Sequence, residues 1–214
     1  MPGDSRRPLR ADAQLNHDRI LEVAARVFAR QGPDTSMKVI AKEAGVGVGT
    51  LYRRFPTREE LVEATYRSET ARLCDAALDL PAAMPADRAL RHWMGLFATY
   101  MSTKHGMGEA LRAILVDEAD RMRTRFLLAD AVGVLMARGA EDGTLRADVD
   151  SYDVLMGLGG VALIAGEPDR PGLTGRLLDL LLDGLRPPTA GQGERAAATP
   201  RPGPSAAGPG GGGG

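Results

Sequence analysis

Two short helices joined by a glycine-containing turn are indicated by residues 36–55, SMKVIAKEAGVGVGTLYRRF. Apolar residues recur at helical spacing in the first of them: Met37, Ile40, Ala41 and Ala44. Gly45 supplies the left-handed backbone that ends this helix. The second helix keeps Leu51 and Phe55 for the core and offers basic, hydroxyl and aromatic side chains to its surroundings. This plan is typical of a helix-turn-helix, whose second helix enters the DNA major groove.

Several side chains of this segment have the chemistry of phosphate contacts. Thr35 or Ser36 stands at a helix start, where free backbone N–H groups also favour a phosphate. The Tyr52 hydroxyl can donate to a phosphate, while Thr50 can contact a phosphate or a thymine methyl group. Two further basic residues add screened positive charge, namely Lys42 and Arg58.

Residues 16–66 resemble the DNA-binding domain of the TetR family of one-component transcriptional repressors. The family pattern is close to T-x-x-x-I-A-x-x-A-G-V-S-x-G-T-L-Y-x-x-F, followed a few residues later by Lys or Arg. The chain carries most of these anchors: Thr35, Ile40, Ala41, Ala44, Gly45, Val46, Gly49, Thr50, Leu51, Tyr52, Phe55 and Arg58. Gly47 departs from the pattern by replacing the usual small hydroxyl or acidic residue. Because glycine caps a helix less well than serine, the second helix is expected to be more weakly capped.

The resemblance assigns five residues to the groove-facing side of the second helix: Val48, Gly49, Thr50, Arg53 and Arg54. Arg53 or Arg54 would then bind the O6 and N7 atoms of a guanine, worth about 1–3 kcal/mol of base discrimination. The alternative for these arginines is that they only solvate a short helix.

Helical periods without a convincing strand from Asp87 to Leu185 predict an all-α protein, and the charge distribution fits a DNA-binding end. The chain is 43% hydrophobic, and no apolar run reaches the roughly 18 residues of a membrane span. Residues 1–60 hold 11 basic and 8 acidic residues, a net charge of +3, whereas the whole chain has −1. No apolar segment follows the first arginines, and Cys74 is the only cysteine, so we expect a cytoplasmic protein without disulfides.

Four segments are predicted along the chain. Residues 1–14 form a flexible basic arm, which either is a disordered leader or contacts phosphates and the minor groove. Residues 15–62 form the three-helix helix-turn-helix DNA-binding domain, with its first helix beginning near Asn16. A helical ligand-binding and dimerisation domain follows over 63–186, opening with a helix of about 57–79. Residues 187–214 are rich in Pro and Gly and are predicted to be a disordered tail.

The body sequence YMSTKHGMGEALRAIL resembles the ligand-binding domain of the SbtR-like group within the TetR family. This resemblance implies a pocket for a small-molecule effector that the sequence does not identify. Adaptable methionines and aromatic rings suit the wall of such a pocket, although ordinary core packing explains the same residues. The candidate lining residues are Trp93, Met94, Phe97, Met101, Met122 and Phe126.

The last predicted helix, about 171–185, has leucines around most of its circumference. A helix that is apolar on most sides must be buried on most sides, and a second subunit is the expected cover. Together with one residue of the preceding helix of about 151–165, the candidate dimer residues are Leu158, Leu177, Leu178, Leu181, Leu182 and Leu185.

The expected function is that of a ligand-responsive, sequence-specific regulator, a repressor that binds a palindromic double-stranded DNA operator as a homodimer. No catalytic residue, cofactor or metal ligand is expected, because the three histidines are far apart and no G-x-S-x-G or phosphate-binding loop is present. The alternative is a helical small-molecule-binding or enzymatic protein in which the helix-turn-helix is only scaffold.

Overall fold

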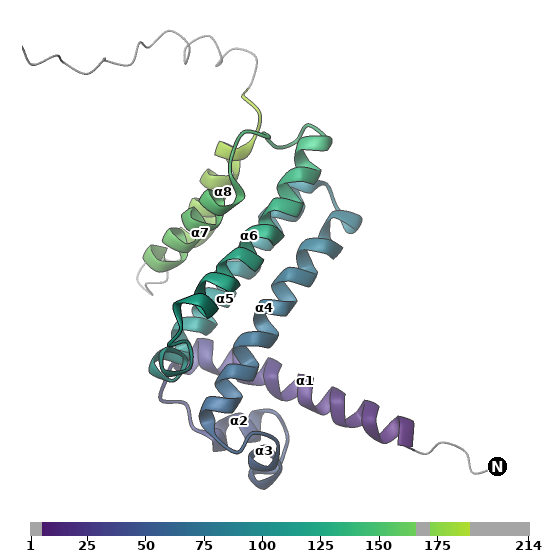
Figure 1. The fold of residues 1–214 in the computed structure, drawn as a ribbon, viewed down its shortest axis with the longest axis vertical. Coiled ribbons are helices and arrows are strands. Elements are labelled where there is room, and N and C mark those ends of the chain that lie inside the picture. The colour runs from purple at the N-terminus through teal and green to yellow at the C-terminus, as the bar shows by residue number, and fades with distance from the viewer. Residues whose placement is uncertain (1–5, 166–171, 189–214) are drawn as a thin grey trace, which may run out of the picture.

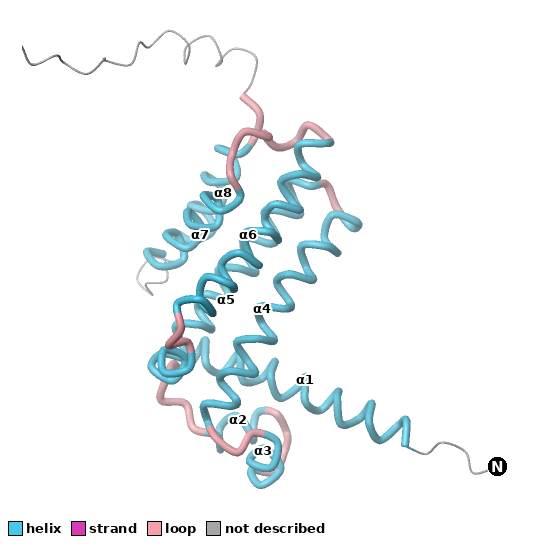
Figure 2. The backbone as a smooth tube through the Cα atoms, in the orientation of Figure 1, coloured by secondary structure: helices cyan, strands magenta, loops and turns pink. Residues whose placement is uncertain are grey.

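The computed structural model describes residues 6–165 and 172–188, which form eight helices. Their order is α1 (Arg6–Gln31), α2 (Met37–Glu43), α3 (Val48–Arg54), α4 (Arg58–Ala83), α5 (Ala86–Ile114), α6 (Glu118–Glu141), α7 (Ser151–Ala165) and α8 (Leu173–Leu185). Loops join these helices, and no strand occurs in the described ranges (Figure 2). The predicted all-α fold class, with a helix-turn-helix domain followed by a helical domain, is confirmed.

The helices divide the molecule into two ends (Figure 1). Helices α2 and α3 lie together at the lower end, where α1 crosses the lower ends of the long helices that form the body of the molecule. The long helices α4, α5 and α6 rise side by side from this end and pack against one another. Helix α7 packs on α5 and α6, α8 packs on α5 and α7, and both lie away from α3. Helix α3 and the α7–α8 pair therefore lie toward opposite ends of the chain.

Helix α1 begins at Arg6, ten residues before the predicted start near Asn16. Pro8 is tolerated in the first turn because the N–H groups there have no partner within the helix. No Gly or Pro interrupts residues 9–31, so nothing in the sequence stops the helix from extending backwards. Residues 6–14 of the predicted arm are thus helical, whereas residues 1–5 and the tail from 189 to 214 lie outside the described residues.

Helix α4 connects the helix-turn-helix end of the molecule with the body, and a threonine caps its first turn. The hydroxyl of Thr57 accepts a hydrogen bond from the backbone N–H of Glu60 at 3.1 Å. The helix continues to Ala83, past Pro81, whereas the sequence predicted an end near residue 79. Pro81 lies in the last turn, and the next turn is closed by the bond from Met84 N to Leu80 O.

The body core is centred on Trp93 of α5, which is completely buried. Its indole N–H donates to the carbonyl of Leu73 on α4 at 2.8 Å, so the one polar atom of the side chain is satisfied. Its ring stacks on Phe97 with the centroids 5.7 Å apart. Burying a large apolar side chain contributes about 1.5–3 kcal/mol relative to exposure, so this cluster holds α4 and α5 together.

Helix α5 is bent at Gly108, where φ is 51° and ψ is −128°. This left-handed backbone favours glycine, and it separates the long first part of α5 from a short turn that ends at Ile114. At the other end of the body, α6 ends at the Asp142-Gly143 pair, in which Gly143 has a φ of 74°.

Candidate nucleic-acid interface

The start of α2 holds its two hydroxyl residues differently. Thr35 is buried, and its hydroxyl donates to the carbonyl of Gly32 at 2.9 Å. Ser36 is exposed and caps the helix by accepting a hydrogen bond from Val39 N at 3.4 Å. Of the two candidate phosphate contacts, Ser36 therefore presents an accessible hydroxyl, while the Thr35 hydroxyl stabilises the turn before α2.

Helix α3 is held in the domain by Leu51, which is fully buried, and by Phe55. Gly47 begins this helix without a side-chain cap, as its replacement of a hydroxyl residue predicts. The opposite face is open to solvent: Tyr52 is 46% exposed, and a Cβ atom on Gly49 would meet nothing within 4 Å. The chain thus presents a free helix face at the lower end of the molecule (Figure 1).

The two arginines of α3 have different local partners. Arg53 Nε donates to the carbonyl of Gly49 at 3.2 Å, and its Nη2 lies 3.5 Å from the Thr50 hydroxyl. Both bonds stay within α3, so Arg53 lies on the face that Gly49 and Thr50 form. Arg54 instead donates from Nε to His17 Nδ1 on α1 at 3.0 Å.

His17 is a residue of this site that the sequence did not reveal, because 37 positions separate it from Arg54. Its ring stacks on Phe55 with the centroids 5.4 Å apart. Burial lowers the pKa of His17, and the nearby charge of Arg54 lowers it further, whereas Asp18 acts in the opposite direction. The neutral imidazole can accept the Arg54 hydrogen bond, which ties α3 to α1.

Arg58 occupies the position of the basic residue in the family pattern, where it is expected to add positive charge. In the structure its guanidinium donates to the backbone carbonyls of Thr35 and Pro33. It also lies 5.4 Å from the centroid of the Phe28 ring. Arg58 therefore joins the start of α4 to the turn before α2 and helps to fix the orientation of the helix pair.

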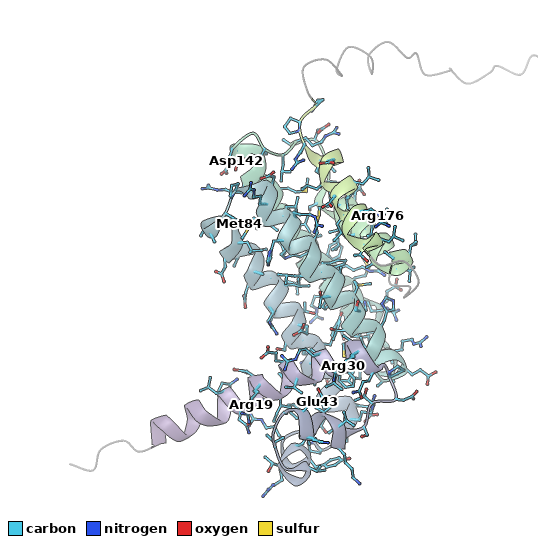
Figure 3. The ribbon with its side chains drawn as sticks, turned by 180° about the vertical axis from the view of Figure 1, so that it is seen from behind. Arg19, Arg30, Glu43, Met84, Asp142 and Arg176 are labelled. Carbon is cyan, nitrogen blue, oxygen red and sulfur yellow. The ribbon has the colours of Figure 1, made fainter. Side chains whose placement is uncertain are left out.

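The remaining basic residue of the predicted set, Lys42, is exposed near the end of α2. The neighbouring Glu43 pairs with Arg30 of α1, with a closest N–O distance of 2.6 Å. Figure 3 shows these two labelled side chains next to each other at the junction of the helices. Such an exposed pair contributes at most about 1 kcal/mol, so its effect is to orient rather than to stabilise.

The candidate pocket residues fall into two groups. Phe97 and Met101 line a cavity of about 170 Å³ between α4, α5, α6 and α7, here named the aromatic cavity. Trp93 and Met94 are fully buried in the core, and they are not among the lining residues of this cavity. Met122 is half-buried, and Phe126 is 55% exposed, because neither residue lies on the buried face of α6. That buried face includes Leu128, Val132 and Leu135.

The candidate dimer leucines are also divided by the fold. Leu158, Leu178, Leu182 and Leu185 are buried within the single chain, and Leu177 and Leu181 are half-buried. Leu180, which was not among the predicted set, is 69% exposed. Leu163 and Ile164 on α7 are similarly exposed and were also outside the predicted set, because leucine spacing does not show which residues the rest of the chain covers.

Comparison with known proteins extends over most of the chain. A solved TetR transcriptional regulator from Streptomyces coelicolor is 46% identical, covers 80% of this chain and 99% of its own, and superimposes with a TM-score of 0.74. The chain belongs to the TetR family of transcriptional regulators. A TetR regulatory protein from Mycobacterium vanbaalenii is 34% identical, with a TM-score of 0.68 over 84% of this chain and 100% of its own.

The N-terminal and C-terminal domains of this TetR-family regulator match separate family models. Residues 20–65 match the N-terminal domain of bacterial regulatory proteins of the tetR family. Residues 85–187 match the C-terminal domain of SbtR-like transcriptional regulators, which confirms the narrower resemblance of the body sequence. An HTH-type transcriptional regulator of Staphylococcus aureus (strain USA300) is 46% identical over 54 residues, 25% of this chain and 29% of that protein. The match therefore spans less than a third of that relative.

These findings identify a DNA-binding transcriptional regulator with a helix-turn-helix, and they favour this assignment over the alternative of an enzyme, because the family is a non-enzymatic one. Within the described ranges, no helix has the length and apolarity to cross a membrane. Nor do any three His, Cys, Asp or Glu side chains of these residues gather where they could hold a metal ion.

Proposed function

We propose that this TetR-family regulator is a homodimeric repressor that binds a palindromic DNA site and loses affinity for it when a small molecule binds its body. The observation that supports the proposal is that one chain presents two separate surfaces, one toward each end of the molecule. One is the open face of α3, and the other is an apolar face formed by α7 and α8. Two copies joined at the second surface can present two α3 helices to successive major grooves, about 34–36 Å apart.

The outer apolar face supports a second copy of the chain as its cover. On α8, Leu177, Leu180 and Leu181 recur at helical spacing, and Leu180 is 69% exposed. On α7, Leu163 and Ile164 are 66% and 63% exposed. Exposed apolar side chains on two packed helices support an interaction site here, and two-fold symmetry lets one face cover another identical to it.

The four buried leucines have a supporting part in this proposal. Leu158, Leu178, Leu182 and Leu185 fix α7 and α8 against the body from within the protomer. The N–H of Arg146 donates to the carbonyl of Leu185 at 2.9 Å, and Arg91 pairs with Asp179 at 2.5 Å. Contacts within one protomer thus hold α7 and α8 in place, so the position of the outer leucines does not depend on the partner.

For DNA recognition, we assign different tasks to the candidate residues. Tyr52, Ser36 and Lys42 would contact phosphates, and these contacts set the register without reading sequence. Val48, Gly49, Thr50 and Arg53 would face the base edges, with Arg53 as the candidate for a guanine. Arg54 and Arg58, whose guanidinium groups bond to His17 and to backbone carbonyls, would act mainly by orienting α3.

The ligand response would pass through the end of α5. A Cβ atom on Gly106 would overlap the carbonyl of Phe28 on α1, and one on Gly108 would lie 2.8 Å from Pro33 Cβ. The end of α5 therefore packs tightly on the DNA-binding domain, and it also borders the cavities of the body. A ligand that shifts this segment changes the position of α1 and α3, and by linkage it weakens DNA binding by the factor that separates its affinities for the two states.

Fluorescence anisotropy with a labelled duplex from upstream of the regulator's own gene tests this function. We expect specific binding that weakens steeply between two salt concentrations, because phosphate contacts release counterions. A scrambled duplex of the same composition serves as the control. Equal affinity for both duplexes, or a chain that is monomeric on DNA, contradicts the proposal.

A further inference from the structure

Two adjoining cavities of the body are lined by basic side chains and by no carboxylate. The aromatic cavity has Lys104, Arg121 and Arg125 in its wall. The second cavity, of about 380 Å³, is here named the Gly108 cavity and is lined by Lys104, Arg112 and Arg121, among others. The two share Met101, Lys104 and Arg121. Among the described residues, no Asp or Glu lines either of them.

The four cations of this wall have no acidic partner within the part of the chain that the structure describes. Arg121 donates to the carbonyl of Leu115 at 3.1 Å. The ammonium group of Lys104 lies 6.0 Å from the centroid of the Tyr66 ring. Both groups thus contact neutral partners, and no carboxylate offsets their charge, which gives the cavities a positive potential.

Other arginines of α6, outside the cavity wall, do have acidic partners. Arg123 pairs with Asp120 at 3.2 Å, and Arg138 pairs with Glu141 at 3.0 Å. Arg121 and Arg125 are four residues apart and so lie on one face of α6, where each repels the other. A ligand that brings a negative charge to this face would relieve the repulsion.

The rest of the aromatic cavity is apolar or neutral. Phe97, Leu128 and Leu155 supply hydrocarbon surface. The hydroxyl of Tyr100 contributes no charge, because burial raises its pKa far above the ordinary value and its closeness to Tyr66 adds to the shift. The volume of the Gly108 cavity, even without the aromatic cavity, lies near the lower end of the roughly 300–1,000 Å³ that small-molecule sites occupy.

We propose that the effector is an organic anion with an apolar body, whose carboxylate or phosphate group is bound by Lys104, Arg121 and Arg125. Its hydrocarbon or aromatic part lies against Phe97 and Leu128 in the aromatic cavity. Guanidinium groups suit both acids, because their N–H donors match two oxygens at once. This inference rests on the proposed function, in which a ligand of the body controls DNA binding.

Two fluorescent probes that differ by one charged group test the inference on the full chain without DNA. They are 1-anilinonaphthalene-8-sulfonate, an anion, and N-phenyl-1-naphthylamine, which has the same ring systems and no sulfonate. The test variant is Lys104→Gln with Arg121→Gln, and Arg125→Gln is a second, milder variant. Arg138→Gln is the matched control, because Arg138 lies on the same helix and lines neither cavity.

We expect the Kd of the anionic probe to rise about tenfold in the double variant, the usual effect of losing a charged hydrogen bond. The Kd of the neutral probe should stay nearly constant, which also shows that the variant is folded. The control should bind both probes as the wild type does. If the charge variants weaken both probes equally, or neither, the inference is overturned.

Competition against the anionic probe distinguishes the acids. Displacement by octanoate but not by octan-1-ol supports a carboxylate ligand, and displacement by octyl phosphate supports a phosphate. Equal displacement by octan-1-ol overturns the anion site. Because these measurements involve no DNA, the anion site can stand while the repressor proposal fails: the anions would then bind the chain yet leave its affinity for the operator duplex unchanged.

Discussion

The backbone of Gly106 on α5 lies directly against the carbonyl group of Phe28 on α1, with no room for a side chain between them. The contact is the closest that an added Cβ atom would make at any glycine of the described residues. It requires glycine for reasons of space, since Gly106 itself is within a helix and has no left-handed backbone. Substitution of Gly106 therefore alters the contact between α5 and α1, through which the proposed ligand response passes.

Gly106→Ala is expected to lower the free energy of unfolding by about 1–3 kcal/mol, because α1 and α5 must move apart to admit the methyl group. Gly95→Ala is the matched control on the same helix, because a Cβ atom there would meet only the end of Arg91 at 4.0 Å. The control should raise stability by about 0.5–1 kcal/mol, as removal of a helical glycine usually does. Urea unfolding followed by circular dichroism measures both, and equal stability of the two variants contradicts the crossing.

His17 predicts a pH dependence of stability. Its pKa in the folded chain is lowered, so the unfolded chain binds a proton more readily, and the free energy of unfolding rises with pH. This contribution is present above the ordinary histidine pKa of about 6.5 and is lost as the pH falls through the lower, folded value. We expect His17→Gln to remove part of the loss of stability between pH 7.5 and 5.5. His92→Gln, at an exposed position, should leave the profile unchanged, and identical profiles for both variants would refute the interpretation.

Leu180→Glu is expected to convert the proposed dimer into monomers, because it buries a charge in the apolar contact between two α8 helices. Leu78→Glu is the control: Leu78 is 65% exposed, nearly the same as Leu180, but lies on α4 outside the outer face. Sedimentation velocity distinguishes the two results. A Leu180→Glu chain that sediments as a dimer would place the interface elsewhere, and melting temperatures of both variants should remain close to that of the wild type.

Two substitutions on α3 separate affinity from sequence preference. Tyr52→Phe is expected to weaken binding to all duplexes alike, because a phosphate contact carries no sequence information. Arg53→Ala is expected to relax the preference at one base position, at a cost of about 1–3 kcal/mol for the preferred site. Anisotropy with a panel of operator duplexes, each with one base pair changed, measures both effects. Unchanged affinity and preference in both variants would show that this face of α3 does not contact DNA.

The sequence by itself determined the features that depend on neighbouring residues. Helical spacing located α2 and α3, and Gly45, with φ 65°, ends the first of them as predicted. The bounds predicted for α7 and α8 differ from the structure by at most two residues. Local hydrogen bonds, caps and left-handed glycines decide such features, and they are visible within a few positions of the chain.

Only the tertiary structure decided which partners the polar side chains find. Arg54 meets His17 across 37 positions, and Arg58 turns back to carbonyls 23 and 25 positions away instead of remaining free for a phosphate. On α8, the exposed charged residues Arg176, Asp179 and Asp183 mark the outward side of the helix, but the sequence does not show which neighbours cover the leucines on its other side. The tertiary structure decides this: α5 and α7 pack against α8 and bury Leu178, whereas Leu180 lies beside the charged residues and stays outside, because the covering helices come from parts of the chain distant in sequence.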